Sequence, residues 1–231
     1  MTSSKLSERL LAAAGFVRPA SFAADIGSDH AYLPIYLCNL GKIRGAVATD
    51  INEGPVARAL INVSSNHLNK KISVLRTDGL RGVEAYKPDD IMICGMGGEL
   101  IINILSAADW LKNSKIRLIL QPMTHADKLR RYLWDSGFAI IGEKIVKEDK
   151  IYQIICAEYT GDIIKYSEIE AIFGKISIEQ RTDVFEEYLS YVKGVFETRR
   201  NGKSISGADV SEENAIITEI DKLLDKGRKD K

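Results

Sequence analysis

Apolar and polar positions in the first 160 residues alternate between two kinds of segment. Short runs of consecutive apolar residues, ended by a glycine or a polar residue, predict buried β-strands. Between them, apolar residues spaced three and four apart predict amphipathic helices. The predicted strands are 22–26, 45–51, 72–79, 89–98 and 115–122, and the predicted helices are 5–14, 32–41, 52–68, 98–111 and 125–137.

This alternation of strand and helix predicts parallel strands joined by right-handed crossovers, with helices on both faces of the sheet. Residues 138–160 depart from the alternation, because two strand-like runs flank a polar turn at 147–150, as in a hairpin. The expected fold is therefore α/β: a doubly wound seven-stranded sheet with one antiparallel end.

The pattern changes near residue 161. Segments 179–202 and 212–229 each carry apolar residues at helical spacing, and a Gly/Ser-containing stretch separates them. This predicts a helical hairpin that resembles a coiled coil. We expect two domains, residues 1–160 and residues 161–231.

Composition narrows the class of protein. The 231 residues are 45% hydrophobic and 28% charged, as in an ordinary globular protein. Basic and acidic residues number 32 each, so the whole chain lacks the basic excess of many nucleic-acid binders, although a local basic face stays possible. The three cysteines are far apart, without metal-ligand spacing, which predicts buried thiols in a reducing compartment and no metal site.

The N-terminal segment is too short and too charged for a signal peptide. No apolar run approaches the roughly 20 residues that a membrane span needs. We therefore expect a cytoplasmic protein that does not enter a membrane.

Polar and glycine residues gather at four successive strand ends. Residues 27–30 follow the first strand, Asp50 ends the second, Asp78 and Gly79 end the third, and the GMGG stretch 95–98 ends the fourth. In open α/β sheets, ligands bind at the carboxyl ends of the strands, where the winding reverses. The four ends together predict a site for a nucleoside-containing ligand.

The first of these turns discriminates between two such ligands. Its sequence, DIGSDHA, has one glycine instead of G-x-G-x-x-G, and it carries Asp25 and Asp29. These carboxylates would repel a dinucleotide pyrophosphate but attract the ammonium and sulfonium groups of S-adenosyl-L-methionine (SAM). The turn therefore favours SAM, with Asp50 on the ribose and Asp78 on the adenine amino group.

Three further features are open to two interpretations. The GMGG stretch is either a tight turn that needs glycines or a place where backbone passes close to donor and acceptor. Gln121 and Pro122 end the fifth strand, where a target base could lie. The basic residues 128, 130 and 131 form either a solvated helix face or a phosphate contact.

Several motifs together resemble one enzyme family. They are DIGSDHAYLP at 25–34, DINEGP at 50–55, TDGL at 77–80, GMGG at 95–98, and LQP followed by LRRYL. Their order and spacing resemble those of the bacterial tRNA adenine-N1-methyltransferases that modify nucleotide 22 in the D-arm. The resemblance covers residues 5–160, and it departs from the family pattern at Met123, where the family usually has asparagine.

The resemblance implies a class I, Rossmann-like methyltransferase fold, SAM as the cofactor and tRNA as the partner. It also implies that Asp25, Gly27, Ser28, Asp29 and His30 form the first SAM loop, that Asp50 binds the ribose and Asp78 and Gly79 bind the adenine, and that Gly95 to Gly98 line the reaction site. Together with the strand-end pattern, this leads us to expect Asp29 and His30 as catalytic residues, Ile51, Met96 and Gly97 as further SAM contacts, and Gly98, Gln121 and Pro122 as contacts of the target base. Arg199 and Arg200 of the helical hairpin either contact tRNA phosphate or lie on a charged helix face without such a role.

The implied reaction makes modest chemical demands. Neutral adenine has a lone pair on N1 and no proton to remove, so the enzyme must align the base and stabilise its developing positive charge. Asp29 could supply that negative charge, or Asp29 and His30 could orient the amino group of the base. Because N1 lies on the pairing edge, the adenine must be flipped out.

Alternatives from other classes remain open at this stage. One is a SAM-dependent methyltransferase for another RNA position or for a small molecule. Another is a nicotinamide-dependent oxidoreductase, against which the missing G-x-G-x-x-G argues. A third is a non-catalytic binding module on the same fold. The sequence leaves both a monomer and a weak dimer open.

Overall fold

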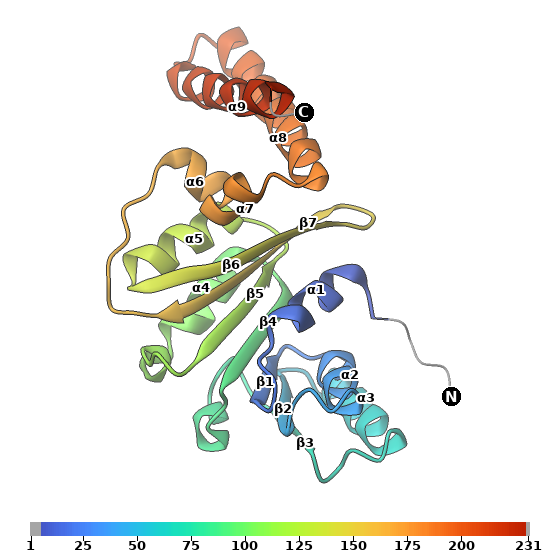
Figure 1. Ribbon diagram of the computed structural model, residues 1–231. Coiled ribbons are helices and arrows are strands. Elements are labelled where there is room, and N and C mark those ends of the chain that lie inside the picture. Colours follow the sequence, from blue (N-terminus) through green and yellow to red (C-terminus); the bar gives the residue numbers. More distant parts are fainter. Residues whose placement is uncertain (1–5, 230–231) are drawn as a thin grey trace. The chain divides into compact units, whose positions relative to one another are not determined.

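The computed structural model describes residues 6–229 (Figure 1). It divides into two compact units, with the division between Ile164 and Lys165. This division falls four residues beyond the one expected from the sequence, because the chain after the last strand still packs on the first unit: the Ile164 N–H donates to the Trp134 carbonyl.

The first unit is built on one seven-stranded sheet of order β3-β2-β1-β4-β5-β7-β6. The first five strands are parallel, and β7 is antiparallel to both of its neighbours. The winding reverses between β1 and β4, so the doubly wound sheet with an antiparallel end is confirmed. The strands are β1 (Phe22–Ile26), β2 (Gly45–Asp50), β3 (Ile72–Arg76), β4 (Asp90–Met96), β5 (Arg117–Pro122), β6 (Phe138–Lys147) and β7 (Ile151–Tyr159).

Helices cover both faces of this sheet (Figure 1). Alternate residues of the central strands point to opposite faces: Met92 joins one buried cluster, while Ile91 and Ile93 join the other. Burial on both faces explains why these strands are apolar throughout. One layer contains α1 (Glu8–Phe16), α2 (Tyr32–Asn39) and α3 (Glu53–Ser65), and the other contains α4 (Gly98–Ser106) and α5 (Ala126–Asp135), with short 3-10 turns η1 (Val83–Tyr86) and η2 (Asp109–Leu111).

Ion pairs connect the segments at the amino ends of the parallel strands, which we call the amino edge of the sheet; the opposite ends form its carboxyl edge. The Arg18 guanidinium and backbone N–H both donate to the fully buried Asp90, at 2.6 and 2.7 Å. Beside them, Asp89 accepts from the Phe22 N–H at 2.7 Å and pairs with Arg44 at 2.6 Å. Burial by itself would raise the pKa of Asp89, but the Phe22 hydrogen bond and Arg44 bring it below its usual value.

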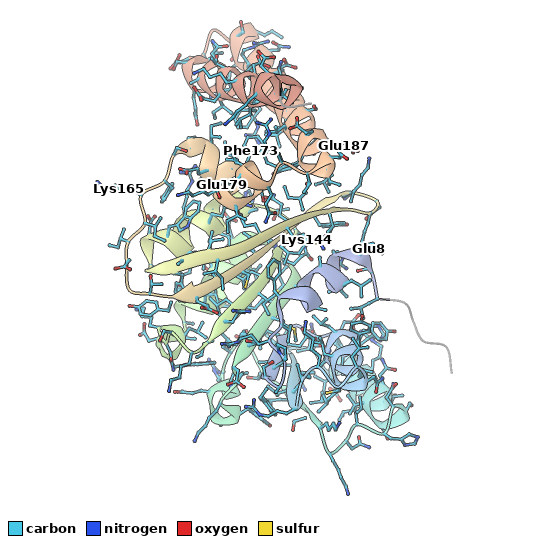
Figure 2. All side chains as sticks on the ribbon, in the orientation of Figure 1. Glu8, Lys144, Lys165, Phe173, Glu179 and Glu187 are labelled. Carbon is cyan, nitrogen blue, oxygen red and sulfur yellow. The ribbon has the colours of Figure 1, made fainter. Side chains whose placement is uncertain are left out.

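The second unit is helical. Its long helices α8 (Asp183–Ile205) and α9 (Ser211–Lys229) form the predicted hairpin, joined by ion pairs such as Lys193 to Asp221 at 2.5 Å. Before them lie two short helices that the sequence analysis did not predict, α6 (Glu168–Phe173) and α7 (Lys175–Gln180). The ring of Phe173, labelled in Figure 2, packs edge-on against Phe185 and Tyr188 of α8.

Candidate active site

The turn after β1 is tied to the rest of the sheet by its backbone. Gly27 has φ +74°, in the left-handed region that favours glycine. Next to it, the Ser28 N–H donates to the Thr49 carbonyl of β2 at 2.7 Å, and the Ser28 hydroxyl donates to the Asp25 carboxyl at 2.5 Å. Asp25 is buried, and this burial raises its pKa to about 6. The turn therefore holds a carboxyl group whose charge depends on its surroundings.

Asp29 and His30 lie on the exposed side of the same turn. The Asp29 carboxylate forms an ion pair with Arg58 of α3, and the Arg58 Nε lies 3.1 Å from the same oxygen. His30 Nε2 is 3.3 Å from the other Asp29 oxygen, and the His30 ring stacks on Tyr32 with centroids 4.8 Å apart. Arg58 was missed by the sequence analysis, which had no signal linking α3 to this turn.

The ends of β2 and β3 follow along the same edge. The Asp50 carboxylate accepts the Asn52 N–H at 2.8 Å, and the Ile51 side chain is exposed. Asp78 is also exposed, and Gly79 has φ +55°. A Cβ on Gly79 would lie 3.4 Å from the Ile104 side chain of α4, so the turn after β3 lies against α4.

The glycine loop after β4 meets the turn after β1. Gly95 has φ +78°, and the pairing of β4 with β5 shifts register at this residue. A Cβ on Gly27 would lie 2.0 Å from the Met96 methyl carbon, and a Cβ on Gly98 would lie 2.4 Å from the His125 carbonyl oxygen. At Gly98 the close approach of backbone requires glycine, whereas at Gly27 the neighbouring atom is the end of a flexible side chain and the left-handed φ is what favours glycine. Gly97 is the N-cap residue of α4.

Gln121 and Pro122, predicted to face the substrate, are buried. The Gln121 amide oxygen accepts the Gly95 N–H at 3.0 Å and an Arg9 N–H at 2.9 Å, while its nitrogen donates to the Pro122 carbonyl at 3.1 Å. Met123, just beyond, is 42% exposed. Gln121 thus supports the glycine loop, and Met123 presents its side chain at the surface.

The basic residues of α5 and α8 have different surroundings. Lys128 pairs with Glu99, and Arg130, which the sequence analysis expected on a solvated face or a phosphate, is buried and pairs with Glu143 at 2.7 Å. In the second unit, the exposed Arg199 lies over the Phe196 ring at 5.2 Å, and Arg200 donates to Asn201 at 3.5 Å. All the other predicted site residues belong to the first unit.

A cavity of about 420 Å³ lies at the opposite, amino edge of the sheet. Its lining includes Tyr132, Ser136 and Tyr159, and it includes none of the predicted site residues. Residues 6–229 contain no helix that is long and apolar enough to cross a membrane. Among these residues, no three His, Cys, Asp or Glu side chains are grouped to bind a metal ion.

This arrangement defines a class of protein. The sheet order, with one antiparallel strand, is that of the class I methyltransferase fold. Asp25, Asp50 and Asp78 lie along the carboxyl ends of the strands. Between β1 and β4, where the winding reverses, the Gly27 turn lies against Met96 of the glycine loop. Carboxylates and exposed glycine backbone suit a nucleoside ligand that carries positive charge. These residues fit SAM.

Comparison with known proteins identifies the family. The sequence model of the tRNA (adenine(22)-N(1))-methyltransferases, TrmK, matches residues 23–225, and the chain belongs to this family. The tRNA (adenine(22)-N(1))-methyltransferase of Bacillus subtilis is 44% identical over 163 residues, which are 70% of this chain and 68% of that protein.

Two solved structures similar to this chain contain ligands of the family. A Streptococcus pneumoniae protein in complex with SAM has 34% identity and a TM-score of 0.84, over 95% of this chain and 99% of that one. M. capricolum TrmK in complex with S-adenosyl-homocysteine has 29% identity and a TM-score of 0.80, over 95% and 98%. The family, fold class, enzyme class and cofactor inferred from the sequence are thereby confirmed.

Proposed function

We propose that this enzyme transfers the methyl group of SAM to N1 of adenosine 22 of tRNA at the carboxyl edge between β1 and β4. The observation that supports this most directly is the contact between the two loops: a Cβ on Gly27 would collide with the Met96 methyl carbon. The SAM-binding turn and the glycine loop are therefore close enough to hold donor and acceptor together.

The cofactor site proposed here follows the strand ends in order. Asp25, Gly27, Ser28 and His30 hold the amino-acid part of SAM, and the buried Asp25 carboxyl becomes ionised beside the ammonium group. Further along the edge, Asp50 and Ile51 hold the ribose, Asp78 and Gly79 hold the adenine, and Gly95, Met96 and Gly97 lie beside the transferred methyl group.

When bound, SAM supplies a methyl group on a sulfonium cation, which the N1 lone pair of adenine can attack. The protein need not remove a proton from neutral adenine, so its residues align the base and balance the positive charge that it gains. Arg58 partly cancels the charge of Asp29 and fixes the direction of its carboxylate. We therefore assign Asp29, with His30, to orienting the amino group of the flipped adenine.

We assign the substrate side of the proposed site to the loops after β4 and β5. Gly98 and Pro122 shape it through their backbone, and Gln121 acts from beneath the surface by holding Gly95. The exposed Met123 takes the place of the family's usual asparagine and would contact the base by its apolar side chain.

For the second unit we propose a role in positioning tRNA. Arg199 and Arg200 on α8 are the residues assigned to phosphate contact. Three other cations of the second unit, Arg181, Lys193 and Lys203, form ion pairs with Glu186, Asp221 and Glu213. A tRNA substrate also agrees with the cytoplasmic location expected for the enzyme.

The test is incubation of the purified protein with labelled SAM and unmodified tRNA, followed by digestion and analysis for 1-methyladenosine. Formation of 1-methyladenosine in a tRNA with adenosine 22, and not in the same tRNA with guanosine 22, is the expected result. Methylation that persists in the guanosine-22 tRNA would identify another RNA position. SAM binding without transfer to any tRNA would favour a small-molecule acceptor.

A further inference from the structure

Arg9 of α1 donates a hydrogen bond to the buried Gln121. It lies outside residues 23–225, the part of the chain that the family model matches. We propose that Arg9 is a positioning residue for methyl transfer, which acts through Gln121 on the glycine loop 95–98. This inference rests on the proposed function, because the loop lies where donor and acceptor are expected to meet.

One buried oxygen atom links Arg9 to the loop. The Gln121 side-chain oxygen accepts from Arg9 Nη1 at 2.9 Å and from the Gly95 N–H at 3.0 Å. Gln121 itself is fully buried. A guanidinium group can only donate hydrogen bonds, so Arg9 strengthens the same orientation of the Gln121 amide that the Gly95 N–H and the Pro122 carbonyl select, with the oxygen towards Gly95. A flipped amide would present its NH₂ group to the Gly95 N–H, and the bond would be lost.

Arg9 is itself held from the other side. The Arg9 backbone N–H donates to the Glu148 carboxylate at 2.5 Å, and the Arg9 guanidinium lies over the Tyr152 ring, 5.6 Å from the centroid. Tyr152 in turn donates to Asp149 at 2.9 Å. The start of α1, marked by Glu8 in Figure 2, therefore bridges the β6–β7 turn and the carboxyl end of β5. A side chain anchored in this way holds a fixed position over Gln121.

The loop end that Arg9 supports is where β4 departs from regular strand geometry. Gly95 has a left-handed φ and sits where β4 shifts register against β5. The next residue, Met96, touches the Gly27 turn. Movement at Gly95 would therefore reach both the SAM turn and the acceptor side, and a misplacement of about 1 Å can cost on the order of a hundredfold in rate.

The first experiment compares kcat for tRNA methylation in Arg9→Met, Arg9→Lys and wild type. We expect Arg9→Met to lower kcat about tenfold, with a change in the Kd of SAM, measured by calorimetry, of less than about threefold. Lysine still donates one hydrogen bond to Gln121, so Arg9→Lys should lower kcat only about threefold.

Arg44→Met is the matched control. Arg44 also lies over an aromatic ring, that of Phe22 at 5.7 Å, and also pairs with a carboxylate, that of Asp89 at 2.6 Å, but at the amino edge. Its removal deletes the same kinds of contact far along the strands from the glycine loop. The kcat of Arg44→Met should equal that of wild type.

Action through Gln121 is tested in a Gln121→Leu background, where Arg9→Met should lower kcat by less than about a further twofold. An undiminished tenfold loss in that background would show that Arg9 meets the substrate directly and would overturn the inference. So would a wild-type kcat for Arg9→Met. Should that variant not fold, Arg9→Lys is used in both backgrounds: loss only with Gln121 present supports the inference, and equal loss overturns it. Failure of the proposed function is a separate result, seen when the wild type forms no 1-methyladenosine.

Discussion

Aspartates lie at both ends of the parallel strands, but their hydrogen-bond and ion-pair partners differ. At the amino edge, Asp90 and Asp89 are met by Arg18, Arg44 and backbone N–H groups. At the carboxyl edge, buried Asp25 receives its hydrogen bond from the neutral Ser28 hydroxyl, and its pKa rises to about 6.

This difference distinguishes the carboxylates that stabilise the fold from the one that we propose to bind SAM. An arginine beside a carboxylate satisfies its charge within the protein and lowers its pKa, as at Asp89. A carboxyl that is buried without such compensation is costly to ionise, and a cationic ligand can supply what the fold does not. Buried acids at strand ends therefore differ in function according to their partners, and not according to their burial.

The largest expected effect is on the amino edge. Arg18→Met leaves the buried Asp90 without its guanidinium partner, which should lower the free energy of unfolding by about 3–5 kcal/mol, towards the lower end because Arg18 is partly exposed. Urea denaturation measures this loss. The kcat per folded molecule should be unchanged, and a large fall in kcat in fully folded protein would break the distinction between the edges.

Next in size is the effect of a methyl group at two tightly packed glycines. In Gly98→Ala the new carbon meets the His125 carbonyl oxygen at 2.4 Å, so the glycine loop must shift and kcat should fall roughly a hundredfold. Gly45→Ala, at the amino edge, meets the Lys71 carbonyl oxygen at 2.8 Å. It should lower the melting temperature and leave the kcat of folded protein intact; similar kcat losses in both variants would contradict the comparison.

A smaller effect is expected when a carboxylate at the end of β2 is removed, and it concerns the affinity for SAM. Asp50→Ala removes the charged hydrogen-bond acceptor that we propose for the ribose, and it should weaken SAM binding by roughly 10- to 100-fold, measured by calorimetry. The matched variant Asp89→Ala removes a carboxylate from the amino edge and should leave the Kd of SAM unchanged. An unaltered Kd in Asp50→Ala would place the ribose elsewhere.

The smallest effect concerns pH. Because the pKa of Asp25 is raised to about 6, the free protein is stabilised by its protonation, fully so below the unfolded value near 4, and loses this stability as pH rises through 6. SAM binding requires the ionised form, so its Kd should be about tenfold weaker at pH 5 than at pH 7. Asp25→Asn should bind SAM weakly at both pH values, and an equally strong pH dependence in that variant would assign the effect to another group.

Much of the fold could be predicted because its signals are local. The apolar runs of β1 and β4 and the helical spacing of α8 depend on residues close together in the chain. The short helices α6 and α7 were missed because six residues carry little periodicity. The sequence did contain one signal for α6: Ser167 and Glu170 form a capping box, each side chain bonding to the backbone of the other residue.

The sequence could predict which strand ends contribute to the candidate site, but not the contacts between their side chains. Parallel strands bring their carboxyl ends to one edge, so the sequence pattern is enough to group Gly27, Asp50, Asp78 and the loop 95–98. The Arg58 to Asp29 pair joins residues 29 positions apart, and the Arg9 to Gln121 bond joins residues 112 positions apart. No periodic pattern reports contacts of that range.

Sequence alone therefore determined the alternation of strands and helices, the acidic and glycine-rich strand ends and, through its motifs, the family. Tertiary structure decided how deeply each polar group at those ends is buried and which hydrogen-bond partners it has. Gln121 ends a strand in the sequence, but packing buries it and turns it towards Gly95, away from solvent. The physical reason is that backbone periodicity is set within a few residues, whereas burial and hydrogen-bond partners depend on which distant segments the fold brings together.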